Sequence, residues 1–191
     1  ALRLFESKYA ENPSDANLYG LALAYKKNNN FNEGLASLDK LLEKYPKNLV
    51  LNTTKVEFLS YFNKFNDALD LANKFLEISP KNYPLSISKS QILLNMGQYF
   101  ESEEIIRDQL LRKNDSPELW FMLSETQKTS QNIVGYHQSR AEYFLLLGQD
   151  EKALNQLEFA LQLTQNNFQV SDRIMTKIIE IKKSLQNSRG L

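Results

Sequence analysis

The sequence predicts an all-α protein, a right-handed α-solenoid of antiparallel helix pairs with about eleven helices. The first observation is a phrase that occurs twice: Phe31 to Pro46 reads FNEGLASLDKLLEKYP, and Phe65 to Pro80 reads FNDALDLANKFLEISP. The step from Phe31 to Phe65, called the repeat period below, is about 34 residues, and a fixed period of that size indicates stacked two-helix units. Apolar residues also recur at helical spacing, without the alternation typical of strands. Only 6 Gly and 5 Pro interrupt these segments.

Residues 1–14 are expected to be the tail of an earlier, truncated repeat. Leu2, Phe5 and Tyr9 fall on one face of a helix. Pro13 precedes Pro46 by one residue less than the repeat period. We therefore expect the chain to be a fragment of a longer protein and to begin inside a repeat.

Three regular repeats are predicted to follow, over residues 15–48, 49–82 and 83–116. Each consists of a leading and a trailing helix, and aromatic residues begin the trailing helices at steps of one repeat period: Phe31, Phe65 and Tyr99. An acidic residue stands two positions further on, where a carboxylate meets the positive end of the helix dipole: Glu33, Asp67 and Glu101. Asn30 and Glu33 also suit a capping box at the start of the first trailing helix.

The fourth repeat starts like the others and then becomes irregular. Ser116 and Pro117 are a favoured N-cap and a favoured first helical residue. The next strong phrase, residues 140–161, aligns with the earlier repeats only if its unit starts at Val134, half a period after Pro117. We therefore predict overlapping repeats over residues 117–167, in which one helix ends one unit and starts the next.

A capping helix is predicted over residues 168–187. Its apolar residues lie on one stripe: Val170, Ile174, Ile178, Ile181 and Leu185. Charged residues lie off this stripe, and a polar outer face is what closes the open end of a solenoid. No linker splits the chain, so we expect a single domain over residues 1–191.

The composition argues against several classes of function. Lys+Arg and Asp+Glu are 23 each, and the absence of net charge argues against a nucleic-acid-binding protein. There is no Cys, so disulfides and thiolate metal sites cannot form. No apolar run is long enough to span a bilayer, so no direct membrane span is expected.

No catalytic residue, metal site or cofactor is predicted for this chain. His137 is the only histidine, whereas a His-Glu-x-x-His zinc site needs two on one helix face. A Cys-His nucleophile system cannot form because there is no Cys, and a Ser-His-acid system would have to use the single His. Glu101, Glu103 and Glu104 are expected to be a solvated helix face rather than an acid–base pair.

The repeat period, with the small residues Ala22 and Ala68 and the prolines Pro46 and Pro80, resembles the tetratricopeptide repeat. The resemblance covers nearly the whole chain and implies that the leading helices line a concave groove. The positions of this sequence that would line it are Tyr19, Leu23, Thr53, Glu57, Ile87, Gln91, Phe121 and Glu125. This mixture of apolar and polar residues suits an extended peptide or a partner helix, and packing between neighbouring helices is the alternative role for each residue.

Some co-chaperone arrays of this family hold a C-terminal carboxylate with Lys, Arg and Asn side chains in the groove. Tyr19, Leu23 and Thr54 stand at the corresponding positions of this sequence. A carboxylate clamp of that kind is therefore not expected.

A narrower resemblance rests on several phrases: residues 19–22 (YGLA), Leu41-Leu42, Tyr45-Pro46, the helix of Trp120, residues 140–143 (RAEY) running on to Ala153-Leu154, and Arg173-Ile174 with Ile178, Ile181 and Lys182. Together they are similar to the C-terminal repeat domain of bacterial periplasmic zinc metalloproteases of the β-barrel assembly-enhancing type. This resemblance implies a periplasmic, non-catalytic module, with a zinc-containing catalytic domain upstream of residue 1. The implied partners are that protease domain and outer-membrane barrel-assembly components.

Two other functions stay open. The first is a scaffold or co-chaperone without a protease domain, acting in envelope or pilus assembly or, alternatively, in the cytoplasm, because repeats alone do not fix a partner. The second is an RNA-binding helical repeat, against which the absence of net charge argues. An enzyme acting by itself ranks last among the hypotheses.

Overall fold

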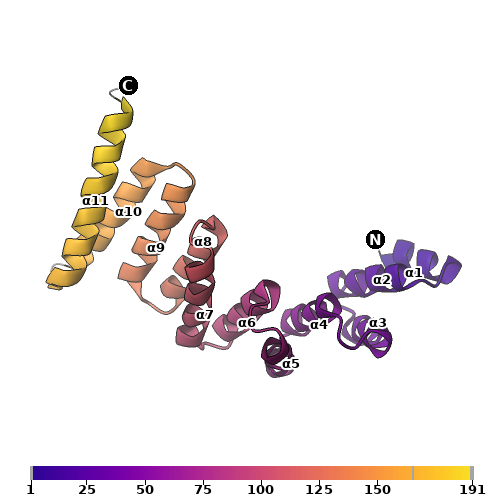
Figure 1. The fold of residues 1–191 in the computed structure, drawn as a ribbon. Coiled ribbons are helices and arrows are strands. Elements are labelled where there is room, and N and C mark those ends of the chain that lie inside the picture. The colour runs from indigo at the N-terminus through magenta and orange to yellow at the C-terminus, as the bar shows by residue number, and fades with distance from the viewer. Residues whose placement is uncertain (1, 165, 190–191) are drawn as a thin grey trace. The chain divides into compact units, whose positions relative to one another are not determined.

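The structure of the protein is a computed structural model that describes residues 2–164 and 166–189, with side chains described as far as Asn187 (Figure 1). Within these residues there are eleven α-helices and no strand, which confirms the predicted all-α fold of helix pairs. The helices are α1 (Leu2–Glu11), α2 (Asp15–Lys27), α3 (Phe31–Lys44), α4 (Leu49–Tyr61), α5 (Phe65–Ile78), α6 (Tyr83–Asn95), α7 (Tyr99–Arg112), α8 (Pro117–Thr129), α9 (Ile133–Leu146), α10 (Asp150–Leu163) and α11 (Phe168–Arg189).

The helices begin at regular intervals. The starts of α2, α4, α6 and α8 are one repeat period apart, and so are the starts of α3, α5, α7 and α9. α10 starts one residue earlier than one repeat period after the start of α8. α11 starts one residue later than one repeat period after the start of α9. The period seen in the sequence is therefore the spacing of the helices.

A side-chain cap begins each of the helices α2, α4, α6 and α8, at steps of one repeat period. A backbone N–H donates to the side chain of Ser14, Asn48, Asn82 and Ser116, over 3.3, 3.1, 3.0 and 3.4 Å respectively. Ser and Asn are favoured there because their side-chain oxygens accept from free N–H groups of the first turn.

The helices α3, α5 and α7 start without such a cap, whereas Asn132 Oδ1 at the start of α9 accepts from Gly135 N over 3.1 Å. Asn30, Lys64 and Gln98 make no side-chain cap bond, so the capping box predicted for Asn30 and Glu33 is wrong. The backbone of the preceding turn already holds the chain at this point, because Asn30 N donates to Tyr25 O over 3.0 Å.

The turns from a first to a second helix contain one residue with a positive φ. These residues are Asn29, Asn63, Gly97 and Gln131, again at steps of one repeat period. Gly148, between α9 and α10, has a φ of 68° and follows Gln131 after only half that step. α9 packs against both α8 and α10, so it is the second helix of one pair and the first helix of the next.

α11 then begins like a first helix. Val170 N donates to Asn167 Oδ1 over 3.3 Å, as Leu119 N does to Ser116 Oγ at the start of α8. The residue limits of the repeats, of the capping helix and of the single domain remain predictions.

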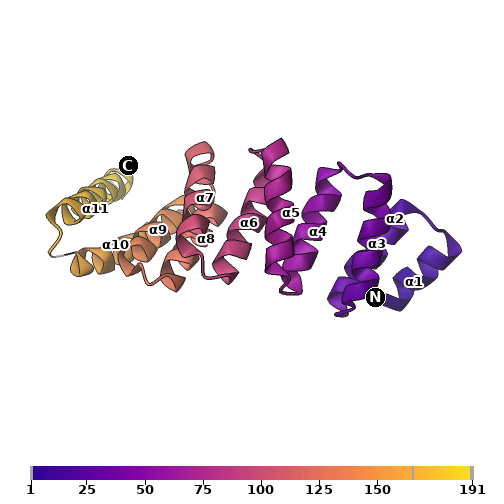
Figure 2. The same cartoon turned by 90° about the horizontal axis from the view of Figure 1, so that it is seen from below.

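The chain divides into two compact units, α1–α6 and α7–α11. In the first unit, α2 packs on α3 and α4 on α5, as Figure 2 shows. Its largest buried cluster is Val56, Leu59, Ala68, Ala72, Phe75, Leu85 and Ile92. The largest cluster of the second unit comes from α9, α10 and α11 and consists of Ala141, Ala153, Leu157, Ala160, Ile174, Ile178 and Ile181.

The surface of α11 differs from the expectation for a capping helix. Its buried side carries Ile174, Ile178 and Ile181, as the predicted stripe requires. The rest of the helix is not wholly polar, because Met175 and Ile179 are exposed to 48% and 59%. The charged residues predicted to lie off the stripe, Arg173, Glu180 and Lys183, are exposed, so the helix has a polar face with an exposed apolar side in addition.

Candidate functional site

The eight residues predicted to line a groove lie on the first helices of successive pairs. Six belong to the first unit and two to the second. Leu23, Glu57, Gln91 and Phe121 are exposed; Tyr19, Ile87 and Glu125 are half-buried; Thr53 is buried. Most of these side chains are thus accessible from solvent.

Thr53 offers little to a ligand. Its hydroxyl donates to Leu49 O, one turn earlier on α4, over 2.8 Å. Thr54 does the same with Val50 O over 2.9 Å, and its oxygen also lies 3.0 Å from the Tyr19 hydroxyl. Both hydroxyls are engaged within the protein, and the contact of Thr54 with Tyr19 fixes the Tyr19 ring between α2 and α4.

Tyr19 lines an apolar hollow of the first unit. The hollow has a volume of 420 Å³ and is lined by Asp15, Ala16, Tyr19, Leu41, Tyr45, Asn48, Val50 and Leu51. Sequence reasoning identified Tyr19 but missed Ala16 and Val50, the latter 68% exposed. The repeat itself contains a signal for this pair, because Ala16 and Val50 occupy equivalent positions of α2 and α4, one repeat period apart.

The polar groups at the rim of this hollow bond to one another. Asp15 Oδ2 accepts from Lys44 Nζ over 2.6 Å and from the Tyr45 hydroxyl over 2.8 Å. The hydrogen bonds from Lys44 and Tyr45 lower the pKa of Asp15, and the bond to Asp15 raises the pKa of Lys44. Asn48 caps α4. The hollow therefore presents apolar surface inside a rim whose polar groups are already paired.

A second hollow of the first unit is more highly charged. It measures 450 Å³ and is lined by Leu35, Lys55, Leu59, Asp67, Asp70, Leu71 and Lys74. Lys55 Nζ donates to Asp39 Oδ1 over 2.6 Å. Charges of both signs border this hollow, so it has no preference for one sign of ligand.

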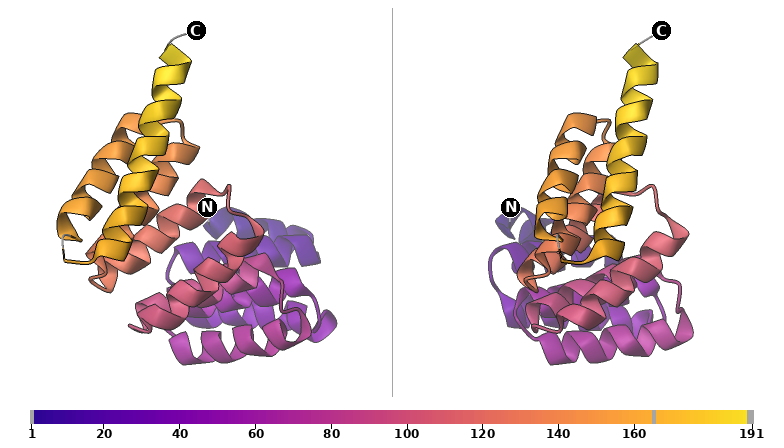
Figure 3. Two further views of the ribbon diagram at one scale, coloured as in Figure 1. Left: turned by 60° about the vertical axis from the view of Figure 1, so that its left-hand side comes forward. Right: turned by 90° about the vertical axis from the view of Figure 1, so that its left-hand side faces the viewer.

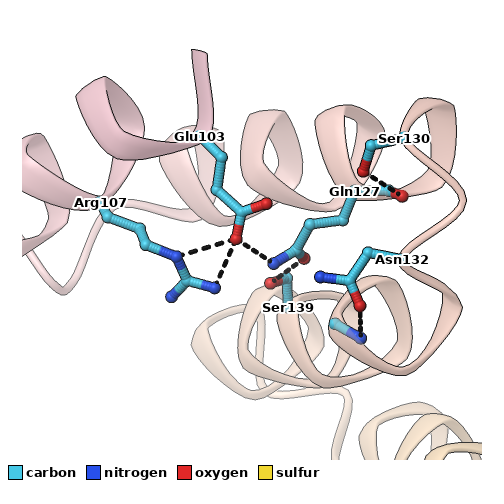
Figure 4. A network of polar contacts seen from close by, with 7 residues as sticks. Glu103, Arg107, Gln127, Ser130, Asn132 and Ser139 are labelled. Atoms are coloured by element: carbon cyan, nitrogen blue, oxygen red, sulfur yellow. Dashed lines mark hydrogen bonds and ion pairs between the residues drawn. The ribbon is translucent and has the colours of Figure 1, made fainter. Parts of the chain in front are cut away.

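A polar network joins α7, α8 and α9 in the second unit (Figure 4). Gln127 is fully buried; its Nε2 donates to Glu103 Oε1 over 3.0 Å, and its Oε1 accepts from Ser139 Oγ over 2.7 Å. Arg107 donates to the same Glu103 oxygen through Nε and Nη2 over 2.9 and 2.6 Å. A buried amide with both ends bonded fixes three helices relative to one another.

The network corrects one expectation about the acidic group on α7. Glu101 and Glu104 are exposed, as expected, but the Glu103 side chain is only 19% exposed and is bonded to α8. Glu103 also borders a hollow of 530 Å³. Its carboxylate is bonded to Arg107 on α7 and to Gln127 on α8, so it holds these helices together.

Arg140 lies among three aromatic rings of the second unit. Its Cζ is 4.8, 5.0 and 5.3 Å from the ring centres of Phe121, Tyr143 and Phe144. Its Nη1 atom is buried and has no hydrogen-bond partner among the described residues. Phe121, one of the predicted groove residues, therefore packs against Arg140 and Tyr143. Part of its ring is covered by these contacts within the protein.

His137 is part of the helix packing. Its Nδ1 lies 2.8 Å from Gln156 Oε1 on α10, and its ring contacts Tyr136 and Phe159. In the described part of the chain, no three His, Cys, Asp or Glu side chains are grouped so that they could hold a metal ion. No described helix is both long and apolar enough to cross a membrane.

Comparison with known proteins gives matches among solved structures. MamA (residues 41 to the end) from Desulfovibrio magneticus matches with a TM-score of 0.61 at 14% identity, over 90% of this chain and 97% of that one. A tetratricopeptide repeat protein from Parabacteroides merdae matches with a TM-score of 0.59 at 14% identity, over 94% and 75%. A thermophilic repeat protein of Thermus thermophilus matches with a TM-score of 0.52 at 20% identity, over 93% and 89%.

No family model and no curated protein matches the sequence. At these identities, the structural matches establish the fold alone. The chain has a tetratricopeptide-like fold of helix pairs.

Proposed function

We propose that this chain is a non-catalytic protein-interaction module. It binds an extended peptide or a partner helix on the first helices of the first unit. The observation that carries the proposal is the 420 Å³ hollow between Tyr19 and Val50. Its wall is apolar and the polar groups at its rim are paired, so an apolar side chain of a partner is the ligand that fits it.

Three titratable groups of the regions described above are engaged in contacts within the protein. Glu103 is paired with Arg107, Asp15 with Lys44, and His137 with Gln156. A general acid or base needs a proton that it can exchange with a substrate. These contacts favour binding over chemistry as the function of the chain.

The test uses a displayed library of short peptides and the variant Val50→Asp. We expect selected peptides to share one large apolar residue and to lose at least about tenfold in affinity for Val50→Asp, because a buried unpaired carboxylate is costly. Leu111→Asp is the matched control, since Leu111 is 87% exposed on α7 and lies outside the hollow. Equal affinity for Val50→Asp and the parent chain would refute the site.

A more specific proposal is that the module is the C-terminal part of a periplasmic zinc metalloprotease. Its support is the resemblance of residues 140–143 and of the other phrases described above. In that case, a catalytic domain upstream of residue 1 carries the zinc, and barrel-assembly components of the outer membrane are the partners. The DNA upstream of the codon for Ala1 tests this proposal. A gene with neither a His-Glu-x-x-His motif nor an export signal would eliminate it.

The second candidate is a scaffold or co-chaperone built from repeats alone, in the envelope or in the cytoplasm. The observation that favours it is the share of the matched chains that is covered, 97% for MamA and 89% for the Thermus protein. Those solved chains consist almost entirely of the part that matches. An upstream gene segment that encodes only further repeats would support this candidate, whereas an upstream protease motif would exclude it.

A further inference from the structure

α11 carries a row of exposed side chains along one side. Its members are Phe168, Asp172, Met175, Ile179, Lys182 and Gln186, all of them exposed. They are spaced alternately by four and three residues, so they share one side of the helix. We call this row the α11 seam.

The seam lies on the side of α11 that corresponds to a covered side of α9 in the same unit. α9, like α11, is the first helix of a pair, and its Val134, Ala141 and Leu145 pack into a cluster with residues of α10. One repeat period later, on α11, stand Phe168, Met175 and Ile179, which are exposed to 83%, 48% and 59%. α11 thus presents apolar residues where a second helix would pack, and residues 2–164 and 166–189 contain no such helix.

α11 also continues past the point at which the other first helices turn. The counterpart of Gly148, one repeat period later, is Lys182, which lies within α11. α11 has 22 residues, whereas α9 and α10 have 14 each. Its end projects beyond both of them in the views of Figure 3. From Phe168 to Gln186 the seam extends over about 27 Å, at about 1.5 Å per residue.

We propose that the seam binds the seam of a second copy of this chain, with the two helices antiparallel. A second helix in this fold runs antiparallel to the first, and the seam is complementary to itself in that orientation. A two-fold axis beside Lys177 sets Met175 opposite Ile179 of the partner subunit and Asp172 opposite Lys182 of the partner subunit. Phe168 then faces Gln186 of the partner subunit, and each contact occurs twice, as two-fold symmetry requires.

The charges select this orientation. A parallel pairing would set Asp172 against the partner's Asp172 and Lys182 against the partner's Lys182, which places like charges opposite each other. Asp172 makes no ion pair within the part of the chain that the structure describes. Lys182 reaches Glu158 only at 3.3 Å, with both side chains about half exposed, so this pair holds it weakly.

The first test is the mass of the chain in solution. Sedimentation equilibrium from about 1 to about 300 μM should show a transition from 22.1 kDa to twice that mass. The seam offers only a small apolar area, so we expect the dimer to be weak and the transition to fall within this concentration range. A monomeric mass at every concentration would overturn the proposal and leave the seam for another occupant, such as a further helix of a longer chain.

Charge reversal tests the pairing. Asp172→Lys and Lys182→Asp should each raise the dissociation constant at least about tenfold, because each creates two like-charge pairs. The double variant should restore it to within about threefold of the parent value. The matched controls are Glu180→Lys and Arg173→Asp, two exposed positions of α11 outside the seam, which should leave it unchanged. Failure of the double variant to recover dimerisation would refute the antiparallel register.

Engineered cysteines test the register directly, because the natural chain has no Cys. In the proposed pairing, Met175 faces Ile179 of the partner subunit. A mixture of Met175→Cys and Ile179→Cys chains should therefore form a disulfide-linked heterodimer faster than either chain forms a homodimer. Faster homodimer formation by either variant would contradict the pairing.

Discussion

Gly34 on α3 and Phe58 on α4 approach so closely that a methyl group at Gly34 would lie 2.6 Å from two carbons of the Phe58 ring. Phe58 is fully buried, and its ring packs against those of Phe31 and Phe62 at centre distances of 5.8 and 5.0 Å. The ring cannot turn towards Phe31 or Phe62 without displacing them. The second helix of one pair therefore contacts the first helix of the next at a position that has no room for a side chain.

Gly34→Ala should destabilise the first unit by about 1–3 kcal/mol through overpacking. The effect should appear although alanine favours a helix by about 1 kcal/mol over glycine. Urea unfolding measures the change. Adding Phe58→Leu to the Gly34→Ala chain should recover part of the loss relative to Phe58→Leu alone. A Gly34→Ala chain more stable than the parent would contradict the contact.

Ala68→Leu tests the corresponding position of the next pair, one repeat period later. Ala68 is fully buried in the cluster of α4, α5 and α6. Three added carbon atoms should cost about 1–3 kcal/mol, which lowers the melting temperature of a domain of this size by several degrees. The exposed neighbour Asn66, changed to Ala, is the control and should leave the melting temperature nearly unchanged. An unchanged melting temperature for Ala68→Leu would refute its place in the core.

Gln127→Glu should make the stability of the second unit depend on pH. It places a carboxyl group beside Glu103, which now accepts a hydrogen bond from Gln127 Nε2 over 3.0 Å. Two carboxylates this close repel each other, and we expect a loss of about 2–4 kcal/mol at neutral pH. In the folded Gln127→Glu chain the two carboxyl groups favour sharing a proton, so the folded state binds more protons than the unfolded state. The loss of stability therefore becomes smaller as the pH falls.

Unfolding by urea at about pH 7 and about pH 5 measures this change. Gln127→Met is the control, since it removes the same hydrogen bonds without adding a charge and should show no comparable pH dependence. A Gln127→Glu chain equally destabilised at both pH values would mean that the two carboxyl groups do not interact.

Asp15 should contribute to acid unfolding of the first unit. The hydrogen bonds from Lys44 and Tyr45 lower the pKa of Asp15 from its ordinary value of 3.8. A lowered pKa in the folded state means that the stabilisation is present above the unfolded pKa and is lost as the pH falls through the folded pKa. The parent chain should therefore exceed Asp15→Asn in stability by a constant amount above about pH 5 and lose this advantage towards about pH 2. A difference independent of pH would contradict the pairing.

The predicted groove residues show what the repeat period can and cannot predict. The period places Tyr19, Thr53, Ile87 and Phe121 at equivalent positions of α2, α4, α6 and α8, and the structure puts them there. Their accessibility differs because it depends on neighbours. Thr53 is buried, and Phe121 packs against Arg140. A period identifies equivalent positions, but it does not show what covers each of them.

The amino-acid sequence by itself determined the helices and their spacing. Helix ends are set locally, by caps such as Ser14 and Asn48 and by turn residues such as Asn29, and each acts within a few residues of the chain. Only the tertiary structure decided the bonds of buried Gln127, the apolar hollow beside Tyr19 and the uncovered seam on α11. Gln127 bonds a residue 24 positions away, and Tyr19 bonds one 35 positions away. Such contacts depend on which faces of separate helices meet, and that is settled by packing between helices rather than by the residues adjacent in the chain.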